Sequence, residues 1–275
     1  MAKEVQIGDV IIGGNRPLAL IAGPCMLESK DLACEIAGEV KNICLELGMP
    51  FIFKASFDKA NRLSVNSKRG PGIEDGLRVL GEIKREFDVP VLTDVHESSQ
   101  VEETARVVDI LQIPAFLCRQ TDLVLAAAMT GKPVNIKKGQ FLSPADMGNI
   151  IMKATSTGNE QVTVTERGVT FGYGNLIVDM RSFPIMSEFG YPVIFDATHS
   201  VQRPGGLGNA TGGDREFVPH LVRAACAVGI DALFLEVHPH PERALSDAAT
   251  MLPLKDLRRV LLQAREVSAA VKRLG

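Results

Sequence analysis

Eight short apolar runs, each followed by an amphipathic stretch, set the strongest constraint on how this chain can fold. Runs such as LALIAGP (18–24) and PVIFDA (192–197) are rich in Val, Ile, Leu and Phe and do not alternate with polar residues. This composition is typical of parallel strands that are buried on both faces. The predicted strands are 18–24, 51–55, 89–95, 107–113, 133–137, 161–166, 192–197 and 232–237.

The stretches between these runs have the periodicity of helices. We expect helices near 31–47, 73–87, 98–106, 120–130, 145–156, 214–228 and 254–272, with a weaker one at 176–188 that Pro184 interrupts. Eight strand–helix units in 275 residues predict an α/β protein with a (β/α)8 TIM barrel. The alternative is an open doubly wound sheet. The first strand, however, ends in Gly23-Pro24-Cys25, which lacks the Gly-rich turn of that fold.

The segment ahead of the first unit has its own pattern. VQIGDVIIGG, within about the first 15 residues, predicts a short β-hairpin, which we expect to close the N-terminal mouth of the barrel. We find no linker, low-complexity segment or repeat in the sequence, so a single domain over 1–275 is expected.

Charge and cysteine content exclude several classes of protein. A formal net charge of −3 argues against a nucleic-acid binder and against a polybasic membrane binder. No apolar run approaches the roughly 20 residues of a transmembrane helix. The charged start, MAKEVQIGDV, does not fit a signal peptide. Five Cys without a CxxC pair argue against a disulfide framework, so we expect the reducing cytoplasm.

Cationic side chains follow the ends of several predicted strands, where the active site of a TIM barrel lies. They are Lys54, Lys59, Arg62, Arg119, Lys137 and Arg167. In a chain of net charge −3, such a group predicts a phosphate or carboxylate ligand. Two alternatives stay open. The cations pair with neighbouring acids on a solvated rim, or Lys54 or Lys137 is the Schiff-base nucleophile of an aldolase.

A second group of strand-end residues has the chemistry of a metal site. Cys25, His199, Glu236 and Asp247 offer a thiolate, an imidazole and two carboxylates, which suit a divalent transition metal. They follow the first, seventh and eighth predicted strands, which are neighbours in a closed barrel. A packed Cys and a satisfied core His are the alternative interpretation. The pair His238 and His240 is a competing metal candidate.

The Gly-rich loop at 200–217 follows the seventh predicted strand. Glycines let backbone amides approach a ligand and let a loop move as a lid, so we expect a lid here. The alternative is a flexible connection without a role in binding.

Several motifs resemble those of the 3-deoxy-D-manno-octulosonate 8-phosphate synthases, over nearly the whole chain. KASFDKANRLS (54–64) is the most specific, because the related seven-carbon synthases have a KPRTS-type motif there. The others are GPGIEDG (70–76), TDVHE (93–97), IPAFLCRQTDL (113–123), VNIKKGQFLSPADMGN (134–149), ERGVTFGYGNL (166–176) and FDATHSVQ (195–202). The resemblance implies a TIM-barrel transferase of lipopolysaccharide biosynthesis that condenses phosphoenolpyruvate with D-arabinose 5-phosphate and releases phosphate.

The resemblance also implies binding roles for individual residues. Phosphoenolpyruvate is expected at Lys59, Arg119, Lys137 and Arg167, with Lys54 and Ser56 lining the same pocket. Arabinose 5-phosphate is expected at Asn61, Arg62, Ser64 and Asp94. In the family, residues at the positions of Arg62 and Ser64 meet the phosphate of a sugar bound in a neighbouring subunit. A homotetramer is therefore expected.

The family has a metal-dependent branch with Cys after the first strand and a metal-independent branch with Asn there. Cys25 fits the former, and the implied ligand set is Cys25, His199, Glu236 and Asp247. These would hold one divalent ion, either Fe, Zn, Mn, Co or Cd. The expected catalytic residues are Lys59, Asn61, His199 and Asp247. Two other functions stay open: a seven-carbon synthase that uses erythrose 4-phosphate, and a sugar-phosphate-binding protein without catalysis.

Overall fold

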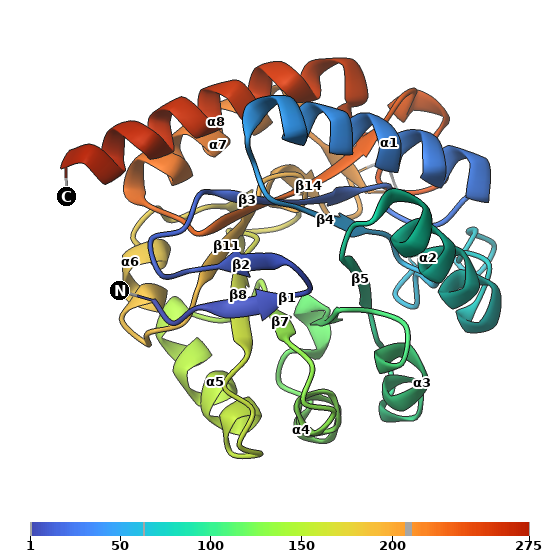
Figure 1. Ribbon diagram of the computed structural model, residues 1–275, viewed down its shortest axis with the longest axis horizontal. Helices are drawn as coiled ribbons and strands as arrows, with labels where there is room; N and C mark the ends of the chain where they lie inside the picture. Colours follow the sequence, from blue (N-terminus) through green and yellow to red (C-terminus); the bar gives the residue numbers. More distant parts are fainter. Residues whose placement is uncertain (1, 63, 207–210, 275) are drawn as a thin grey trace.

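Eight parallel strands form a closed barrel in the computed structural model, which describes residues 2–62, 64–206 and 211–274 (Figure 1). The strands are β3 (Ala19–Gly23), β4 (Phe51–Lys54), β5 (Val91–Asp94), β6 (Ile110–Ile113), β7 (Val134–Lys137), β8 (Val162–Glu166), β11 (Val193–Asp196) and β14 (Ala232–His238). Each pairs with its neighbour in chain order, and β14 pairs with both β11 and β3, which closes the ring. The predicted barrel is confirmed, and the open sheet is wrong.

Helices surround the barrel, because each strand is apolar on both faces and its outer face must be covered. They are α1 (Lys30–Leu47), α2 (Ile73–Phe87), α3 (Val101–Ala105), α4 (Thr121–Met129), α5 (Met147–Thr155), α6 (Ser182–Ser187), α7 (Val218–Val228) and α8 (Leu254–Leu274). Short strands add small hairpins and an edge: β9 (Val169–Thr170), β10 (Leu176–Ile177), β12 (Gln202–Arg203), β13 (Gly212–Gly213) and β15 (Leu252–Pro253).

The helix predicted at 176–188 is wrong over its first part. Gly172 and Gly174 adopt positive φ angles of 67° and 69°, which reverse the chain so that β10 pairs antiparallel with β9. The helix α6 begins only at Ser182. Just before it, the carboxylate of Asp179 accepts a hydrogen bond from the backbone N–H of Arg181 at 3.0 Å. Turn chemistry therefore overrides the weak helical pattern here.

The N-terminal residues form the predicted hairpin, with β1 (Val5–Ile7) and β2 (Val10–Ile12) paired antiparallel. The alternating apolar side chains of the hairpin point to one face, as the two-residue period of a strand requires. They form one buried cluster with residues inside the barrel: Val5, Ile7, Val10, Ile12, Ala19, Ile21, Ile52, Leu92, Ile110, Ile194, Ala232 and Phe234. The hairpin thus closes one end of the barrel, as expected.

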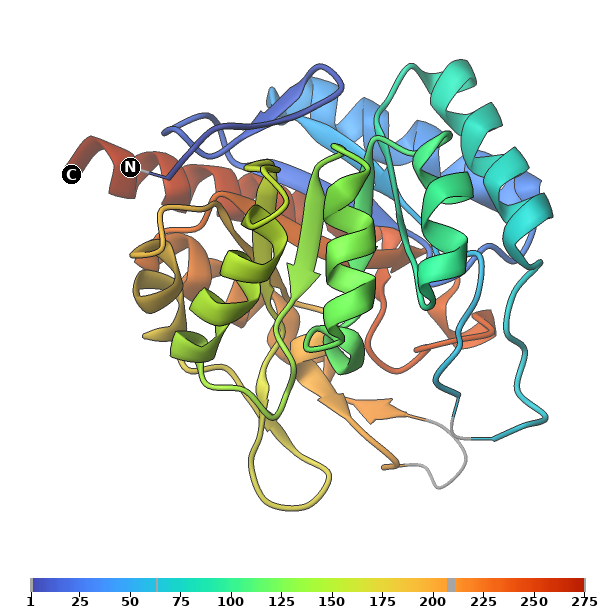
Figure 2. The ribbon, with the colours of Figure 1, turned by 90° about the horizontal axis from the view of Figure 1, so that it is seen from below.

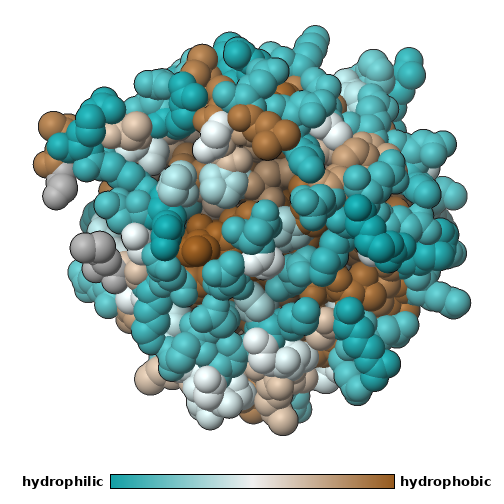
Figure 3. Space-filling model, viewed as in Figure 1, coloured by the Kyte–Doolittle hydropathy of each residue, from teal (hydrophilic) through white to brown (hydrophobic). Residues whose placement is uncertain are grey.

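The two ends of the barrel differ. The hairpin side presents a mostly hydrophilic surface with scattered apolar patches (Figure 3). Figure 2 shows the loops that leave the C-terminal ends of the strands at the opposite end, including the β9–β10 and β12–β13 hairpins. Within the described part of the chain, no helix is both long and apolar enough to cross a membrane.

Shortening a buried side chain of the hairpin should destabilise the fold. Ile7 is fully buried, so Ile7→Ala is expected to lower the free energy of unfolding by about 2–5 kcal/mol. Leu45→Ala, at a side chain 68% exposed on α1, is the control and should change it by less than about 1 kcal/mol. Urea denaturation followed by circular dichroism measures both. Equal losses in the two variants would mean that the hairpin is not part of the core.

Candidate active site

A cavity of about 540 Å³ opens at the C-terminal ends of the barrel strands. Because parallel strands all end at the same rim, side chains that follow them in the sequence converge there. The predicted residues that line the cavity are Lys54, Ser56, Lys59, Asn61, Arg62, Asp94, Lys137, Arg167, His199 and Asp247. Most residues of the two predicted groups, cationic and metal-ligating, therefore meet in one place.

Cys25, Glu236 and Asp247 form a cluster of potential metal ligands, and Asp247 also lines the cavity. Glu236 pairs in register with Gly23, two residues before Cys25, so both side chains enter from neighbouring strands. Their ligand atoms and that of Asp247 all lie within 4.8 Å of one another. The thiol of Cys25 donates a hydrogen bond to Asp247 Oδ2 at 3.2 Å.

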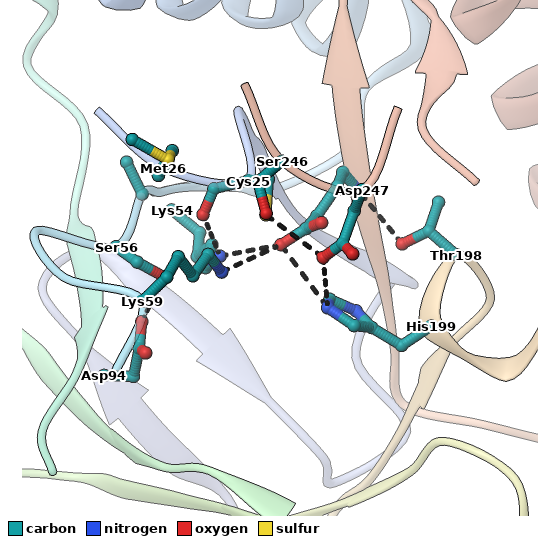
Figure 4. A network of polar contacts seen from close by, with 12 residues as sticks. Cys25, Met26, Lys54, Ser56, Lys59, Asp94, Thr198, His199, Ser246 and Asp247 are labelled. Carbon is teal, nitrogen blue, oxygen red and sulfur yellow. Dashed lines mark hydrogen bonds and ion pairs between the residues drawn. The ribbon is translucent and has the colours of Figure 1, made fainter. Parts of the chain in front are cut away.

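His199 approaches the same cluster from the turn η4 (His199–Val201) after β11. Its Nε2 lies 3.6 Å from Glu236 Oε1 and 3.7 Å from Asp247 Oδ2. Figure 4 shows His199, Asp247 and Cys25 directed toward one another, with Lys54 and Lys59 on the other side. Three of the four predicted metal ligands therefore form one group, and His199 lies next to two of them, Glu236 and Asp247.

The donor set and its environment fit a metal ion. Glu236 is fully buried, and its Oε2 has no hydrogen-bond partner among the described residues, which is costly for a carboxylate unless a cation is bound. Asp247 has a φ of 48°, a conformation that non-glycine residues adopt at a cost. Burial, together with the carboxylates of Asp247 and Glu236, raises the pKa of the Cys25 thiol well above its ordinary value. A nearby divalent cation would reverse this effect.

The competing pair, His238 and His240, does not form such a site. The side chain of His240 is 62% exposed, whereas His238 is buried, with its Nδ1 accepting the backbone N–H of His240 at 2.9 Å. The Nε2 of His238 faces Glu28 at 3.8 Å. In the described segments, the Cys25 cluster is the one group of three or more potential ligands whose atoms lie together.

Two buried lysines are held by carboxylates. Lys54 Nζ lies 2.8 Å from Glu236 Oε1, and Lys137 Nζ pairs with Asp196 and lies 3.7 Å from the centroid of the Phe234 ring. Both lysines therefore pair with acids, but the pairs are buried and do not lie on the solvated rim that the alternative interpretation requires.

Lys59 and Arg167 retain unused capacity for an anion. Lys59 Nζ is 3.8 Å from Glu236 Oε1. Burial acts to lower the pKa of Lys59, but the charges of Cys25, Glu236 and Asp94 raise it well above its usual value. Arg167 is 4% exposed and donates from Nη2 to Gln202 Oε1 at 2.7 Å. Its Nη1 is buried without a hydrogen-bond partner in the part of the chain that the structure describes.

Asp94, the last residue of β5, lines the cavity and holds two neighbouring side chains. Its carboxylate accepts a hydrogen bond from Ser56 Oγ and lies 2.9 Å from His96 Nε2. Burial acts to raise the pKa of Asp94, but His96 and Lys59 lower it well below its usual value. Asp94 is therefore an anion, which suits a role in accepting hydrogen bonds from hydroxyl groups.

Some predicted residues are not brought into the cavity. Arg119 is exposed and lines an adjoining hollow with Glu97 and Leu117. Ser64 lies in the loop between β4 and α2, where its Oγ accepts the backbone N–H of Asn66 at 3.3 Å. Of the Gly-rich loop, residues 207–210 lie outside the described residues, and the flanking segments form β12 and β13.

Arg62 lines the cavity but is already engaged. Its Nη1 donates to Ser246 Oγ at 2.8 Å and its Nη2 to the Leu245 carbonyl at 3.1 Å, so it ties the loop that carries Asp247. Sequence reasoning missed Ser246 and Gln202, which contact predicted residues. The strand-end rule does find Asp196, but the sequence assigns it no role.

Comparison with known proteins gives consistent results. The chain matches the model of the DAHP synthetase I family over residues 2–273. It is 58% identical over 272 residues to the 2-dehydro-3-deoxyphosphooctonate aldolase of Geotalea daltonii, covering 99% of this chain and 100% of the relative. The aldolase of that name from Fusobacterium nucleatum is 59% identical over 270 residues, with 98% and 97% covered. The one from Syntrophotalea carbinolica is 55% identical over 272 residues, with 99% and 98% covered.

Proposed function

Because the chain belongs to the DAHP synthetase I family and is similar throughout to its 2-dehydro-3-deoxyphosphooctonate aldolases, we propose that it is an octulosonate phosphate synthase. It condenses phosphoenolpyruvate with D-arabinose 5-phosphate and water, giving 3-deoxy-D-manno-octulosonate 8-phosphate and phosphate. The observation that carries this proposal is one cavity lined by Lys59, Lys137 and Arg167 together with Asp247, which belongs to the Cys25–Glu236–Asp247 cluster.

The reaction forms one carbon–carbon bond and breaks one carbon–oxygen bond. C3 of phosphoenolpyruvate bonds to the aldehyde carbon of the sugar, whose oxygen gains a proton. Water adds to C2 and loses a proton. Phosphate then leaves C2 with the bridging oxygen and takes up the proton that the remaining hydroxyl loses as it becomes the ketone. Atoms and charges balance without an oxidant or a reductant.

Binding of the first substrate follows from the buried cations. Phosphoenolpyruvate carries a phosphate and a carboxylate, and both repel the phosphate of the sugar. Lys59, Lys137 and Arg167 offset this repulsion in a desolvated cavity, where charge–charge attraction is strong. Lys54 and Ser56 line the same pocket, and Arg119 joins the set from the adjoining hollow. Fixing both substrates in one orientation supplies much of the rate enhancement.

The sugar is proposed to lie on the other side of the cavity. Asp94 accepts hydrogen bonds from its hydroxyl groups, and Asn61 orients it. Arg62 and Ser64 are proposed to bind the phosphate of a sugar held in a neighbouring subunit of a homotetramer. Ser64 does not line the cavity of its own chain, which is consistent with a contact to a sugar held in another subunit. The enzyme is proposed to act in the cytoplasm.

The proposed metal ligands are Cys25, His199, Glu236 and Asp247, and the ion is one of Fe, Zn, Mn, Co or Cd. When bound, a divalent metal supplies a Lewis acid that polarises and orients the reacting oxygens. The chain's own groups move the protons. Lys59 Nζ donates a proton to the oxygen that develops from the aldehyde, and the Asp247 carboxylate accepts one from the attacking water. His199 keeps its Nε2 directed toward Asp247.

The choice of sugar tests the proposal. Purified enzyme should release phosphate from phosphoenolpyruvate with arabinose 5-phosphate at least about a hundredfold faster than with erythrose 4-phosphate, since a pocket built for polar contacts rejects a substrate that lacks them. Phosphate release with each aldose measures this ratio. Faster release with erythrose 4-phosphate would assign the seven-carbon activity. Binding of both substrates without turnover would leave a sugar-phosphate-binding protein, and trapping of substrate by borohydride would point to a Schiff base.

A further inference from the structure

The carboxylate of Asp196, fully buried at the end of β11, contacts one residue from each half of the site. Its Oδ2 lies 2.8 Å from His199 Nδ1 and pairs with Lys137 Nζ. Its Oδ1 accepts hydrogen bonds from the backbone N–H of His199 at 2.9 Å and from Thr198 Oγ at 3.2 Å. One side chain therefore connects a proposed metal ligand to a proposed phosphoenolpyruvate ligand.

For His199, these contacts decide which nitrogen faces the cluster. With Nδ1 beside Asp196, Nε2 is left to face Glu236 and Asp247. Metal-ligating histidines are commonly oriented in this way by a carboxylate on their other nitrogen. The contact between Asp196 Oδ2 and His199 Nδ1 is close but is not aligned as a hydrogen bond. The hydrogen bond from the backbone N–H of His199 to Asp196 Oδ1 holds the turn η4 in place, and with it the imidazole.

For Lys137, the same carboxylate supplies the buried counter-charge. Lys137 is 5% exposed and its amine lies over the Phe234 ring, an environment that disfavours an ammonium ion. Burial lowers the pKa of Lys137, and the charge of Asp196 opposes that shift. The contact also fixes Nζ at the inner wall of the cavity, where an anion can reach it.

We propose that Asp196 is a shared positioning residue, which sets the imidazole of His199 for the metal and the ammonium of Lys137 for phosphoenolpyruvate. The inference rests on the proposed function for the identity of these two ligands. It predicts that a single change at Asp196 weakens the affinity for the metal ion and the affinity for phosphoenolpyruvate together. Asp196 itself is not proposed to contact either the ion or phosphoenolpyruvate.

Asp196→Asn tests this, because the amide keeps the shape and removes the charge. The affinity for Zn²⁺, measured by competition with a chelator, should fall about 10–100-fold. The affinity for phosphoenolpyruvate alone, measured by calorimetry, should fall at least about tenfold. Asp231→Asn is the matched control, since this carboxylate accepts the Val193 N–H at 2.8 Å at the other end of β11. It should leave both affinities within about twofold of the wild type.

Three results would overturn the inference: an unchanged pair of affinities in folded Asp196→Asn, a change in only one of them, or equal changes in the Asp231→Asn control. Should Asp196→Asn not fold, ¹⁵N NMR of the wild-type histidines decides, with His199→Gln assigning the signal. The proposal requires His199 to carry its proton on Nδ1, and the opposite tautomer would refute it. Both affinities are measured without turnover. A wild-type protein that binds but does not condense the substrates would count against the proposed function alone.

Discussion

Arg167→Gln is expected to lower kcat/KM for phosphoenolpyruvate by about three orders of magnitude. The guanidinium is buried, and one of its nitrogens has no hydrogen-bond partner among the described residues, so a bound anion gains a desolvated charge contact there. Loss of one partner of such a contact costs about 4 kcal/mol. That corresponds to about a thousandfold in rate. Steady-state phosphate release over a range of phosphoenolpyruvate concentrations measures the change.

Arg78→Gln provides the control, because Arg78 is exposed on α2 and pairs with the acids Asp75 and Glu82 of the same helix. This variant should keep kcat/KM within about twofold of the wild type, as surface changes usually do. Arg167→Lys keeps the positive charge but lacks the paired N–H donors of the guanidinium, so it should retain only part of the activity. If Arg167→Gln lost less than about tenfold, the anion would lie elsewhere in the cavity, and Lys59 with Lys137 would be its main ligands.

The barrel was accessible from the sequence because its strands are continuous apolar runs. A strand such as β11 is buried along its whole length, so its composition identifies it without knowledge of its partners. The N-terminal hairpin was equally clear from its alternation. The β9–β10 hairpin was not, because it depends on the positive φ angles of Gly172 and Gly174, and helical periodicity does not report turn geometry.

The site was predictable in its residue types and less so in its contacts. Strand-end logic placed Cys25, His199 and Glu236 on adjacent strands. In the structure Cys25 and Glu236 form a group with Asp247, and His199 lies 3.6 Å from Glu236. Asp247 lies in a loop, where no periodic pattern applies, so the family resemblance strengthened its assignment. The double role of Asp196 and the engagement of Arg62 with Ser246 depend on which atoms meet across distant segments. Local sequence patterns do not encode such contacts.

Removal of the metal is expected to abolish most of the activity. Replacement of Cys25 is expected to make the rate independent of a metal ion. Wild-type enzyme stripped with a chelator should lose at least about a hundredfold in rate and regain it when Mn²⁺, Zn²⁺ or Co²⁺ is added, since the ion completes a ligand group in which the buried Glu236 Oε2 otherwise has no hydrogen-bond partner among the described residues. Phosphate release before and after add-back, with metal content measured in parallel, tests this. A fully stripped enzyme that kept its rate would exclude a catalytic metal here.

Cys25→Asn places at this position the residue that the metal-independent branch of the family has. The amide has no charge and a weaker affinity for transition metals, so the ratio of rates with and without chelator should approach one, at a reduced absolute rate. Cys226→Ala is the control: Cys226 is a buried cysteine on α7 whose pKa burial raises to about 12, and it lies outside the cluster. This variant should remain sensitive to chelator. If folded Cys25→Asn were inactive under all conditions, the metal would do more than orient and polarise the reactants, because orientation alone can be supplied by an amide hydrogen bond.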